Sequence, residues 1–318
     1  MKRRVALLLL CGLVLSSCNR GKKRIIGVVP KATSHLFWQA VQAGAQAAGK
    51  EFDVEVLWNG PAQETDYSRQ VQIVDSLIAR RVDGIALAAT DRIALVQPLD
   101  RAMASGIPVT IFDSGLDSTN YVTFVTTNNY EAGKMAARKM AELLSGKGNV
   151  ALVLHMPGSY STMERERGFE DVIPKEFPAI RIVARQYGMS DRAKSRAAAE
   201  NILAAHPDLD GVFCSTEPSS TGTSLALKAR EMAGKVKFVA FDSSENIVAD
   251  LKQGTIHAMV VQDPFLIGHE AVRTLVDKLS GKTPPKLLDL SGRVITKADL
   301  DNPDVRRLLF PEILTNPR

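Results

Sequence analysis

The sequence predicts an α/β protein built from two doubly wound lobes, each a parallel sheet with helices on both faces. Short apolar, β-branched runs alternate with segments of helical periodicity along most of the chain. The alternation starts again after about residue 120, so each half has enough elements for its own sheet. The length of 318 residues also suits two domains.

In the first half, four apolar runs alternate with three helical segments. The run at 25–29 is uniformly apolar, and Ser34 is suited to cap the helix that follows. Val71, Val74 and Leu77 recur at helical spacing, and Gly106 closes the third helix. The predicted strands are 25–29, 52–58, 84–89 and 107–112, and the predicted helices are 34–50, 64–81 and 95–104.

The second half repeats this pattern with apolar strands and intervening helices. The predicted strands are 121–125, 150–154, 180–187, 212–214, 236–241 and 258–261. The predicted helices are 130–144, 165–173, 192–205, 220–233, 245–252 and 265–279. The final segment, 299–318, contains three prolines and no strand–helix rhythm, so we expect it to wrap the surface.

The N-terminus has the features of an export signal. Lys2, Arg3 and Arg4 precede an apolar run at 5–14 that is too short to span a bilayer. The next residues read LSSC and end at Cys18, which resembles a bacterial lipoprotein signal with an acylated cysteine. An ordinary secretory peptide cut nearby is the alternative. The signal is therefore predicted at 1–18, with a tether at 19–23.

Composition and motifs exclude several classes of function. The formal net charge of +5 is mild, and no nucleic-acid-binding motif accompanies it. The five histidines lack zinc-site spacing, and the sequence has no Walker loop, dinucleotide fingerprint or G-x-S-x-G elbow. We therefore expect no metal and no cofactor. Cys214 follows an apolar run and is expected to be a buried strand residue in a mature chain without disulfides.

Polar and aromatic residues follow most of the predicted strands. In doubly wound sheets, ligands bind beyond the carboxyl ends of the strands. Such side chains suit a neutral polyhydroxyl ligand, since carboxylates and amides pair with hydroxyls and aromatic rings pack on sugar C–H faces. The strand-end residues are 31–38, 90–91, 113–114, 126–129, 215–218, 242–243 and 262–263.

Taken together, the segments from 25 to about 297 resemble the type I periplasmic substrate-binding proteins, the ribose- and galactose-binding family. Their order and spacing carry the resemblance. The segments are Ile26 to Trp38, Gly106-Ile107-Pro108-Val109 leading to Phe112-Asp113, Arg165-Glu166-Arg167-Gly168-Phe169, Ala205-His206-Pro207-Asp208, Val239-Ala240-Phe241-Asp242 and Val261-Gln262-Asp263-Pro264.

The resemblance implies a set of sugar-contacting residues. Phe37 and Trp38 match the family's stacking aromatics, and Asp113 and Asp242 match its two carboxylates. The remaining implied ligand residues are His35, Arg167, Thr216 and Gln262. The chain departs from the ribose-type pattern at Ser114, where an arginine is frequent, and lacks the second-lobe aromatic near Ser190. These departures argue against ribose itself as the ligand.

Structural roles are the alternative for several of these residues. Asp113 and Asp242 are also suited to turns or helix caps. Arg167 is also suited to surface ion pairs with neighbouring glutamates, and His35 to a solvent-facing first turn. The two aspartates could alternatively form a glycosidase pair. The family resemblance favours binding, so we expect no enzymatic activity.

The resemblance implies a lipid-anchored solute receptor of an ABC-type sugar importer in the periplasm or at the cell surface. Its partners would be a monosaccharide-like molecule and a membrane permease, and we expect a monomer. The first lobe is expected at 24–126 plus 263–289, the second at 127–262 plus 290–298, and an extension at 299–318. Three crossovers would form the hinge. A sensor that signals to a chemoreceptor or histidine kinase is the alternative function, and a lipoprotein enzyme on the same scaffold also stays open.

Overall fold

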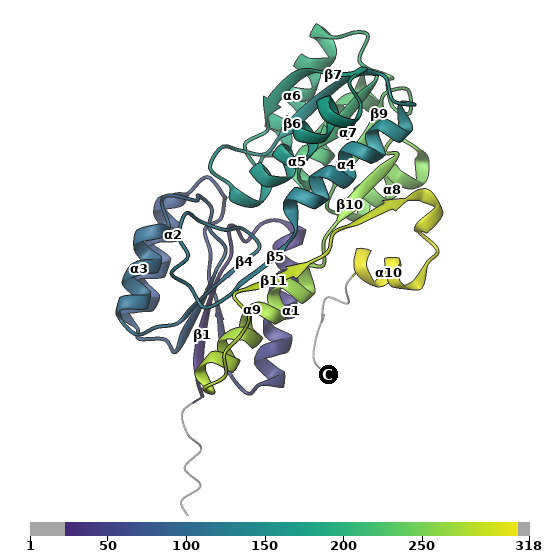
Figure 1. Cartoon of the computed structure of the whole chain (residues 1–318). Coiled ribbons are helices and arrows are strands. Elements are labelled where there is room, and N and C mark those ends of the chain that lie inside the picture. Colours follow the sequence, from purple (N-terminus) through teal and green to yellow (C-terminus); the bar gives the residue numbers. More distant parts are fainter. Residues whose placement is uncertain (1–22, 311–318) are drawn as a thin grey trace, which may run out of the picture.

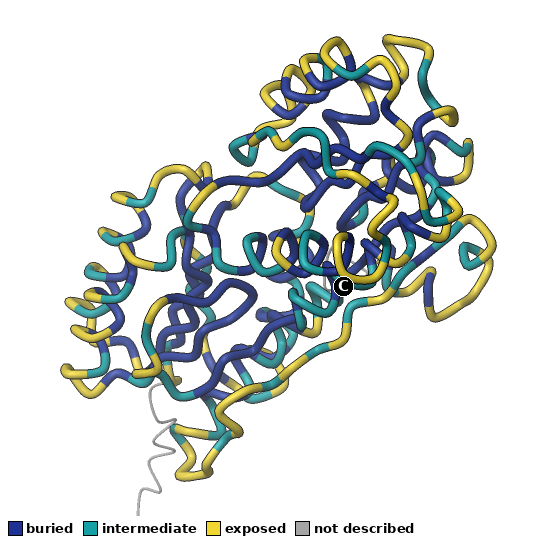
Figure 2. Tube along the Cα trace, turned by 45° about the horizontal axis from the view of Figure 1, so that its top comes forward, coloured by how far each residue is buried: buried dark blue, intermediate teal, exposed yellow. Residues whose placement is uncertain are grey.

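Two six-stranded sheets organise the chain, one in each lobe of the computed structural model, which describes residues 23–310 (Figure 1). Helices cover both faces of each sheet, so the predicted fold class is confirmed. Buried positions run through the centre of both lobes, and exposed positions lie along the outer faces of the helices (Figure 2). No helix among the described residues is long and apolar enough to span a membrane.

The sheet of the first lobe is entirely parallel and has the order β11-β5-β4-β3-β1-β2. Its central strands are mostly apolar and buried except at Ile25, as expected when helices cover both faces. The strands are β1 (Ile25–Val29), β2 (Glu55–Trp58), β3 (Gly84–Leu87), β4 (Val109–Phe112), β5 (Phe124–Thr127) and β11 (Leu287–Leu290).

Two pairs of helices enclose this sheet. Helices α1 (Leu36–Glu51) and α9 (Pro264–Leu279) cover one face, and α2 (Tyr67–Ala79) and α3 (Val96–Ala104) cover the other. A β-carbon added to Gly44 of α1 would lie 1.9 Å from the Phe265 carbonyl oxygen of α9. Glycine is therefore required for α9, which comes late in the chain, to pack closely on α1.

The sheet of the second lobe has the order β12-β10-β9-β8-β6-β7. It is parallel except at one edge, where β12 runs antiparallel to β10. The strands are β6 (Gly148–Leu154), β7 (Ile180–Tyr187), β8 (Gly211–Cys214), β9 (Lys237–Phe241), β10 (Ala258–Val261) and β12 (Arg293–Thr296).

The helices of the second lobe bury two separate cores. Helices α4 (Asn129–Leu143) and α5 (Tyr160–Glu176) pack on one face. The other face carries α6 (Arg192–Ala205), α7 (Glu217–Ala229) and α8 (Glu245–Gln253). A short 3₁₀ helix (Lys297–Asp299) leads to α10 (Pro303–Leu309), whose Val305 and Leu309 join this second core.

The chain passes between the lobes three times. It leaves the first sheet after β5, returns from β10 to α9, and crosses again from β11 to β12. The last crossing is visible in Figure 1 as the strand that runs from the lower lobe towards the upper one. Each lobe is therefore assembled from separate segments of the chain. The three connections lie close together, since the Asn128 backbone N–H donates to the Leu290 carbonyl and Gly292 lies against Thr127 and Val260.

The structure corrects three predictions about individual elements. His35, and not Ser34, is the N-cap of α1, because the Ser34 hydroxyl donates to the Ala62 carbonyl (3.1 Å). The strands β11 and β12 were not predicted. The segment after residue 299 contains α10 and contributes to the core, whereas the sequence predicted only a surface wrap. Residues 1–22, including the predicted signal and Cys18, lie outside the described residues.

Candidate functional site

A polar cavity lies between the lobes, at the carboxyl ends of strands from both sheets. Every predicted ligand residue except Arg167 lines it. The lining side chains are Lys31, His35, Phe37, Trp38, Glu64, Asp113, His155, Ser161, Thr162, Arg165, Thr216, Glu217, Pro218, Asp242 and Gln262.

Asp113 and Asp242 occupy equivalent places in the two lobes. Each directly follows a buried strand, β4 or β9, and each has a positive φ, of 56° and 63° respectively. Neither residue is a helix N-cap, and for α8 the N-cap is Ser244. The capping alternative therefore does not apply, and both carboxylates line the cavity.

Burial raises the pKa of Asp113 to about 6, although Lys31 and Arg165 act in the opposite direction. Among residues 23–310, no hydrogen bond reaches its carboxylate. Burial also raises the pKa of Asp242, although Arg165 and Gln262 favour its ionised form. Asp242 accepts hydrogen bonds from the Gln262 amide (2.8 Å) and the Glu217 backbone N–H (3.2 Å). Asp113 therefore has acceptor capacity that the protein itself does not use.

The arginine that faces the cavity is Arg165, and the expectation for Arg167 is corrected. Arg167 is half exposed on the outer face of α5, pairs with Glu164 (2.5 Å) and stacks over Tyr130. Arg165 is 2% exposed, donates to Asn129 Oδ1 (2.7 Å) and the Ser215 carbonyl (3.0 Å), and lies over the Phe241 ring. Helical phase explains the difference, because two residues along a helix reverse the direction of the side chain.

The two adjacent aromatic residues have different roles. Phe37 is partly buried and lines the cavity, with its ring centroid 5.0 Å from that of Trp38 in an edge-on arrangement. Trp38 is 2% exposed, packs in the core of the first lobe and donates from Nε1 to Glu64 (3.1 Å). Phe37 is thus the more accessible aromatic surface.

A buried cluster of Lys31, Glu64 and His155 joins the lobes across the cavity. Glu64 lies 3.1 Å from Lys31 Nζ and 2.9 Å from His155 Nε2, and Lys31 also donates to Ser159 Oγ (2.9 Å). Burial would raise the pKa of Glu64, but Lys31 and His155 hold it well below its usual value. Glu64 therefore remains a carboxylate that ties the two lobes together.

Further contacts close the lobes on each other beside this cluster. The Arg92 backbone N–H donates to the Gly158 carbonyl (2.9 Å), and the Ser161 backbone N–H donates to Ser114 Oγ (3.3 Å). The rings of Phe124 and Tyr160 also meet edge-on. The described conformation is therefore closed around the cavity.

Sequence reasoning missed several cavity residues, and they differ in whether the sequence contained a signal for them. His155 directly follows β6, so the strand-end rule applied to that strand would have identified it. Arg165, Ser161 and Thr162 share the buried face of α5, so the helical periodicity of this segment could have identified them as inward-facing residues. Glu64 belongs to the connection between β2 and α2, where no pattern distinguishes it from other loop carboxylates.

Several cavity atoms have no hydrogen-bond partner within the described part of the chain. His155 Nδ1, Glu217 Oε2 and Gln262 Oε1 are buried and unpaired there. Buried polar atoms without partners are costly. The cavity therefore offers carboxylate, amide, imidazole and guanidinium groups from both lobes to a polar ligand.

Residues 26–283 match the model of the periplasmic binding protein domain. A ribose import binding protein of Bacillus subtilis is 29% identical over 312 residues, which cover 93% of this chain and 100% of that protein. A D-allose-binding periplasmic protein of Escherichia coli is 29% identical, covering 87% of this chain and 91% of that protein.

Solved structures resemble the whole two-lobed arrangement. A carbohydrate transporter solute binding protein from Agrobacterium radiobacter, in complex with D-arabinose, is 30% identical with a TM-score of 0.88. An ABC transporter solute binding protein from Agrobacterium vitis, with bound D-fucose, is 35% identical with a TM-score of 0.87. In both comparisons the match covers 90% of this chain and 99% of the other.

Proposed function

The chain belongs to the periplasmic binding protein family, and from this premise we propose that it is the extracytoplasmic solute receptor of an ABC-type sugar importer. It binds a monosaccharide or similar polyol in the cavity between its lobes. One observation carries this proposal: hydrogen-bonding capacity that the described chain leaves unused, of Asp113 in the first lobe and of His155, Glu217 and Gln262 in the second, surrounds one polar cavity.

The chemistry of the cavity suits a neutral ring with many hydroxyls. Asp113 and Asp242 supply carboxylates that accept from hydroxyl groups, and Arg165 supplies a buried donor. Phe37 supplies an aromatic surface for the apolar C–H face of a sugar ring. The relatives named for ribose and D-allose, and the structures with D-arabinose and D-fucose, support the same ligand class.

Ligand binding stabilises the closed arrangement in this mechanism. Asp113 belongs to the first lobe and Arg165 to the second, so one ligand contacts both only when the lobes are together. This difference in affinity between the open and closed states drives closure. The three crossovers between the sheets serve as the hinge, with lobes at 24–126 plus 263–289 and 127–262 plus 290–298. A membrane permease then recognises the closed receptor.

A thermal-shift screen with pentoses, hexoses and polyols tests the proposal, followed by calorimetry on each hit. A ligand at one hundred times its dissociation constant adds about 2.7 kcal/mol to the free energy of unfolding. We expect at least one free sugar to stabilise the protein without being converted, as product analysis of the same mixture would show. A screen in which no sugar or polyol binds would contradict the receptor function, and turnover would replace it with an enzymatic one.

The N-terminal sequence supports a membrane-attached location for the receptor. We propose that it acts as a monomer in the periplasm or at the cell surface, held to a membrane by lipid on Cys18. The tetrapeptide LSSC after a short apolar run supports this proposal. Two or more acyl chains are needed for stable anchoring, since a single chain binds membranes only marginally.

A further inference from the structure

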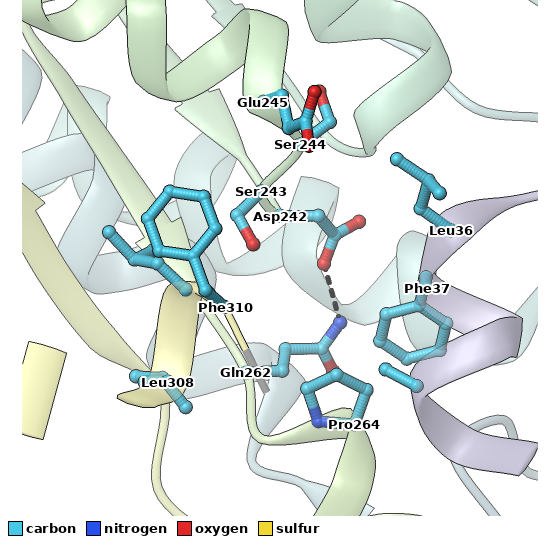
Figure 3. A pocket seen from close by; sticks show the side chains of 12 residues that line it. Leu36, Phe37, Asp242, Ser243, Ser244, Glu245, Gln262, Pro264, Leu308 and Phe310 are labelled. Carbon is cyan, nitrogen blue, oxygen red and sulfur yellow. Dashed lines mark hydrogen bonds between the residues drawn. The ribbon is translucent and has the colours of Figure 1, made fainter. Parts of the chain in front are cut away.

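A second cavity of about 170 Å³ adjoins the polar one. Phe37, Asp242 and Gln262 line both, so the two cavities share a wall. The second cavity lies between the start of α1, the connection from β9 to α8, and the end of α10 (Figure 3). A ligand bound in the polar cavity thus has a space beside it into which a substituent can extend.

Apolar side chains dominate this second cavity, in contrast to the polar one. Leu36 and Phe310 are 39% and 48% exposed, respectively, so large apolar side chains face open space there. Figure 3 shows the side chains of α1 facing those of the C-terminal segment across the cavity. The apolar lining residues are Leu36, Phe37, Ala40, Pro264, Leu308, Leu309 and Phe310.

Helix α10 forms one wall of this cavity and packs against the core of the second lobe. Val305 and Leu309 are buried in the core of the second lobe, and this contact positions Leu308 and Phe310 at the cavity. The match to the periplasmic binding protein domain ends at residue 283. The wall formed by α10 therefore belongs to a part of this chain outside the matched domain.

An unpaired polar atom lies at the junction of the two cavities. Gln262 is 4% exposed, and its amide nitrogen donates to Asp242 Oδ1 (2.8 Å). Its carbonyl oxygen, Oε1, is buried without a hydrogen-bond partner among the described residues. A hydroxyl group of the sugar ring at this junction would donate to that acceptor.

We propose that the ligand of this receptor is a glycoside, a sugar whose ring carries an apolar alkyl or aryl substituent. This inference rests on the proposed sugar-binding function. The hydroxylated ring occupies the polar cavity, and the substituent occupies the cavity between α1 and α10. Phe37, Asp242 and Gln262 belong to both linings, so the apolar cavity lies directly beside the polar one, and this adjacency supports a single ligand that fills both.

Calorimetry with methyl and phenyl glycosides of D-fucose and D-arabinose, in both anomeric forms, tests the inference. Methyl and phenyl glycosides lack the same free hydroxyl and differ in apolar bulk, so their comparison isolates the second cavity. We expect the phenyl glycoside of at least one sugar to bind at least about tenfold more tightly than its methyl counterpart, because it buries more apolar surface.

Substitutions at the cavity wall should remove this preference. Leu36→Ser and Phe310→Ser each reduce the ratio of phenyl to methyl affinity to below about threefold, because each replaces apolar wall with a polar group. Leu225→Ser is the matched control. Leu225 is 46% exposed on α7 and does not line the cavity, so its substitution leaves the ratio unchanged.

The outcomes separate this inference from the function on which it rests. If free sugars or methyl glycosides bind but phenyl glycosides gain nothing, the inference is overturned and the receptor function stands. A phenyl preference that survives both wall substitutions also overturns it. If neither sugars nor glycosides bind, the receptor function fails and the inference fails with it.

Discussion

At the scale of single residues, two aspartates hold the same unusual backbone conformation in the two lobes. Asp113 and Asp242 both have φ values in the left-handed region, where aspartate and asparagine are tolerated better than most residues. Alanine at either position would change the backbone as well as the carboxylate. Asparagine preserves the conformation and removes only the charge, so it is the cleaner substitution.

Asp113→Asn should weaken sugar binding at least about tenfold, because hydrogen bonds to a charged acceptor contribute roughly 1.5–3 kcal/mol each. The free energy of unfolding should not fall, since burial of this carboxylate is unfavourable and raises its pKa to about 6. Calorimetry and denaturant unfolding on the purified variant measure the two quantities. Unchanged affinity would remove Asp113 from the binding site.

Sugar affinity should also depend on pH through Asp113. Its pKa is raised from 3.8 to about 6, so the carboxylate gains a proton as the pH falls through 6. Protonation relieves the cost of burying the charge but removes a charged acceptor from the ligand. Affinity should therefore decrease below about pH 6 in the wild type, and calorimetry across this range should show no such decrease in Asp113→Asn.

Arg165 and Arg167 form a natural pair of test and control. Arg165→Ala should abolish detectable sugar binding, because it removes a buried donor, the hydrogen bond to Asn129 Oδ1 and the positive charge that lies 3.9 Å from the Asp242 carboxylate. Arg167→Ala should change affinity less than about twofold, because its ion pair with Glu164 is at the surface. Equal effects of the two substitutions in calorimetry would contradict the assignment of Arg165.

Sequence reasoning located most of the cavity, including Lys31, but not Glu64 and His155 of its buried cluster. Strand-end position identified Asp113, Thr216, Asp242 and Gln262, because parallel strands bring their carboxyl ends to one edge. Glu64 of the first lobe meets His155 of the second only when the lobes close, and no sequence pattern records which loop carboxylate faces the other lobe.

At the scale of elements, close packing of α4 on α5 determines where Arg165 lies. A β-carbon added to Gly133 of α4 would lie 2.0 Å from the Arg165 carbonyl oxygen, and one added to Gly168 of α5 would lie 2.1 Å from the Tyr130 carbonyl oxygen. Both helices thus present glycine where the backbone of the other approaches. The position of the cavity arginine depends on this contact.

Gly133→Ala should destabilise the fold by about 1–3 kcal/mol, although alanine favours helices, because the added methyl group forces α4 and α5 apart. Sugar affinity should fall as well, since α5 carries Arg165. Denaturant unfolding and calorimetry measure both effects. Glu142→Ala, at an exposed position of α4, is the control. It should change neither the free energy of unfolding nor the free energy of sugar binding by more than about 0.5 kcal/mol.

The elements that the sequence did not predict are those that depend on distant contacts. Strands β11 and β12 have four residues each and are only partly buried, so their apolar pattern is weak. They form as strands because β11 pairs with β5 and β12 pairs with β10. Helix α10 has seven residues and is too short to be stable alone, so its packing through Val305 and Leu309 maintains it.

At the scale of the whole molecule, the cluster of Lys31, Glu64 and His155 should stabilise the closed state. Glu64→Gln leaves Lys31 buried without its carboxylate, and breaking a buried pair in this way costs about 3–5 kcal/mol. We expect the variant to compact less with saturating sugar than the wild type in solution scattering. Equal compaction would show that the cluster does not couple the lobes.

The same cluster predicts an acid limit to stability. The pKa of Glu64 in the folded state is depressed well below 4.5. The ionised carboxylate therefore contributes fully to the free energy of unfolding above about pH 4.5, and this contribution is lost as the pH falls through the depressed pKa of the folded state. Thermal unfolding of the wild type should show this loss under acidic conditions. Glu64→Gln should show a flatter dependence on pH, and an identical dependence would exclude Glu64 as its source.

Cys18→Ser should yield an exported protein without lipid, because serine cannot form the thioether to the lipid. Membrane fractionation after labelling with a radioactive fatty acid measures this. The wild type should carry the label and sediment with membranes, whereas the variant should carry none. Label that persists on the variant would exclude Cys18 as the attachment site.

The three passages of the chain between the lobes have a consequence for biogenesis. The core of the first lobe joins Ile26 and Val28 of β1 to Ile267 and Leu275 of α9, and β11 completes its sheet only at Leu290. A chain that emerges N-terminus first therefore keeps this lobe incomplete until nearly all of it has been delivered. Contacts of such long sequence separation slow folding. Slow, late folding of this kind keeps a polypeptide extended enough to be threaded through a narrow translocation channel.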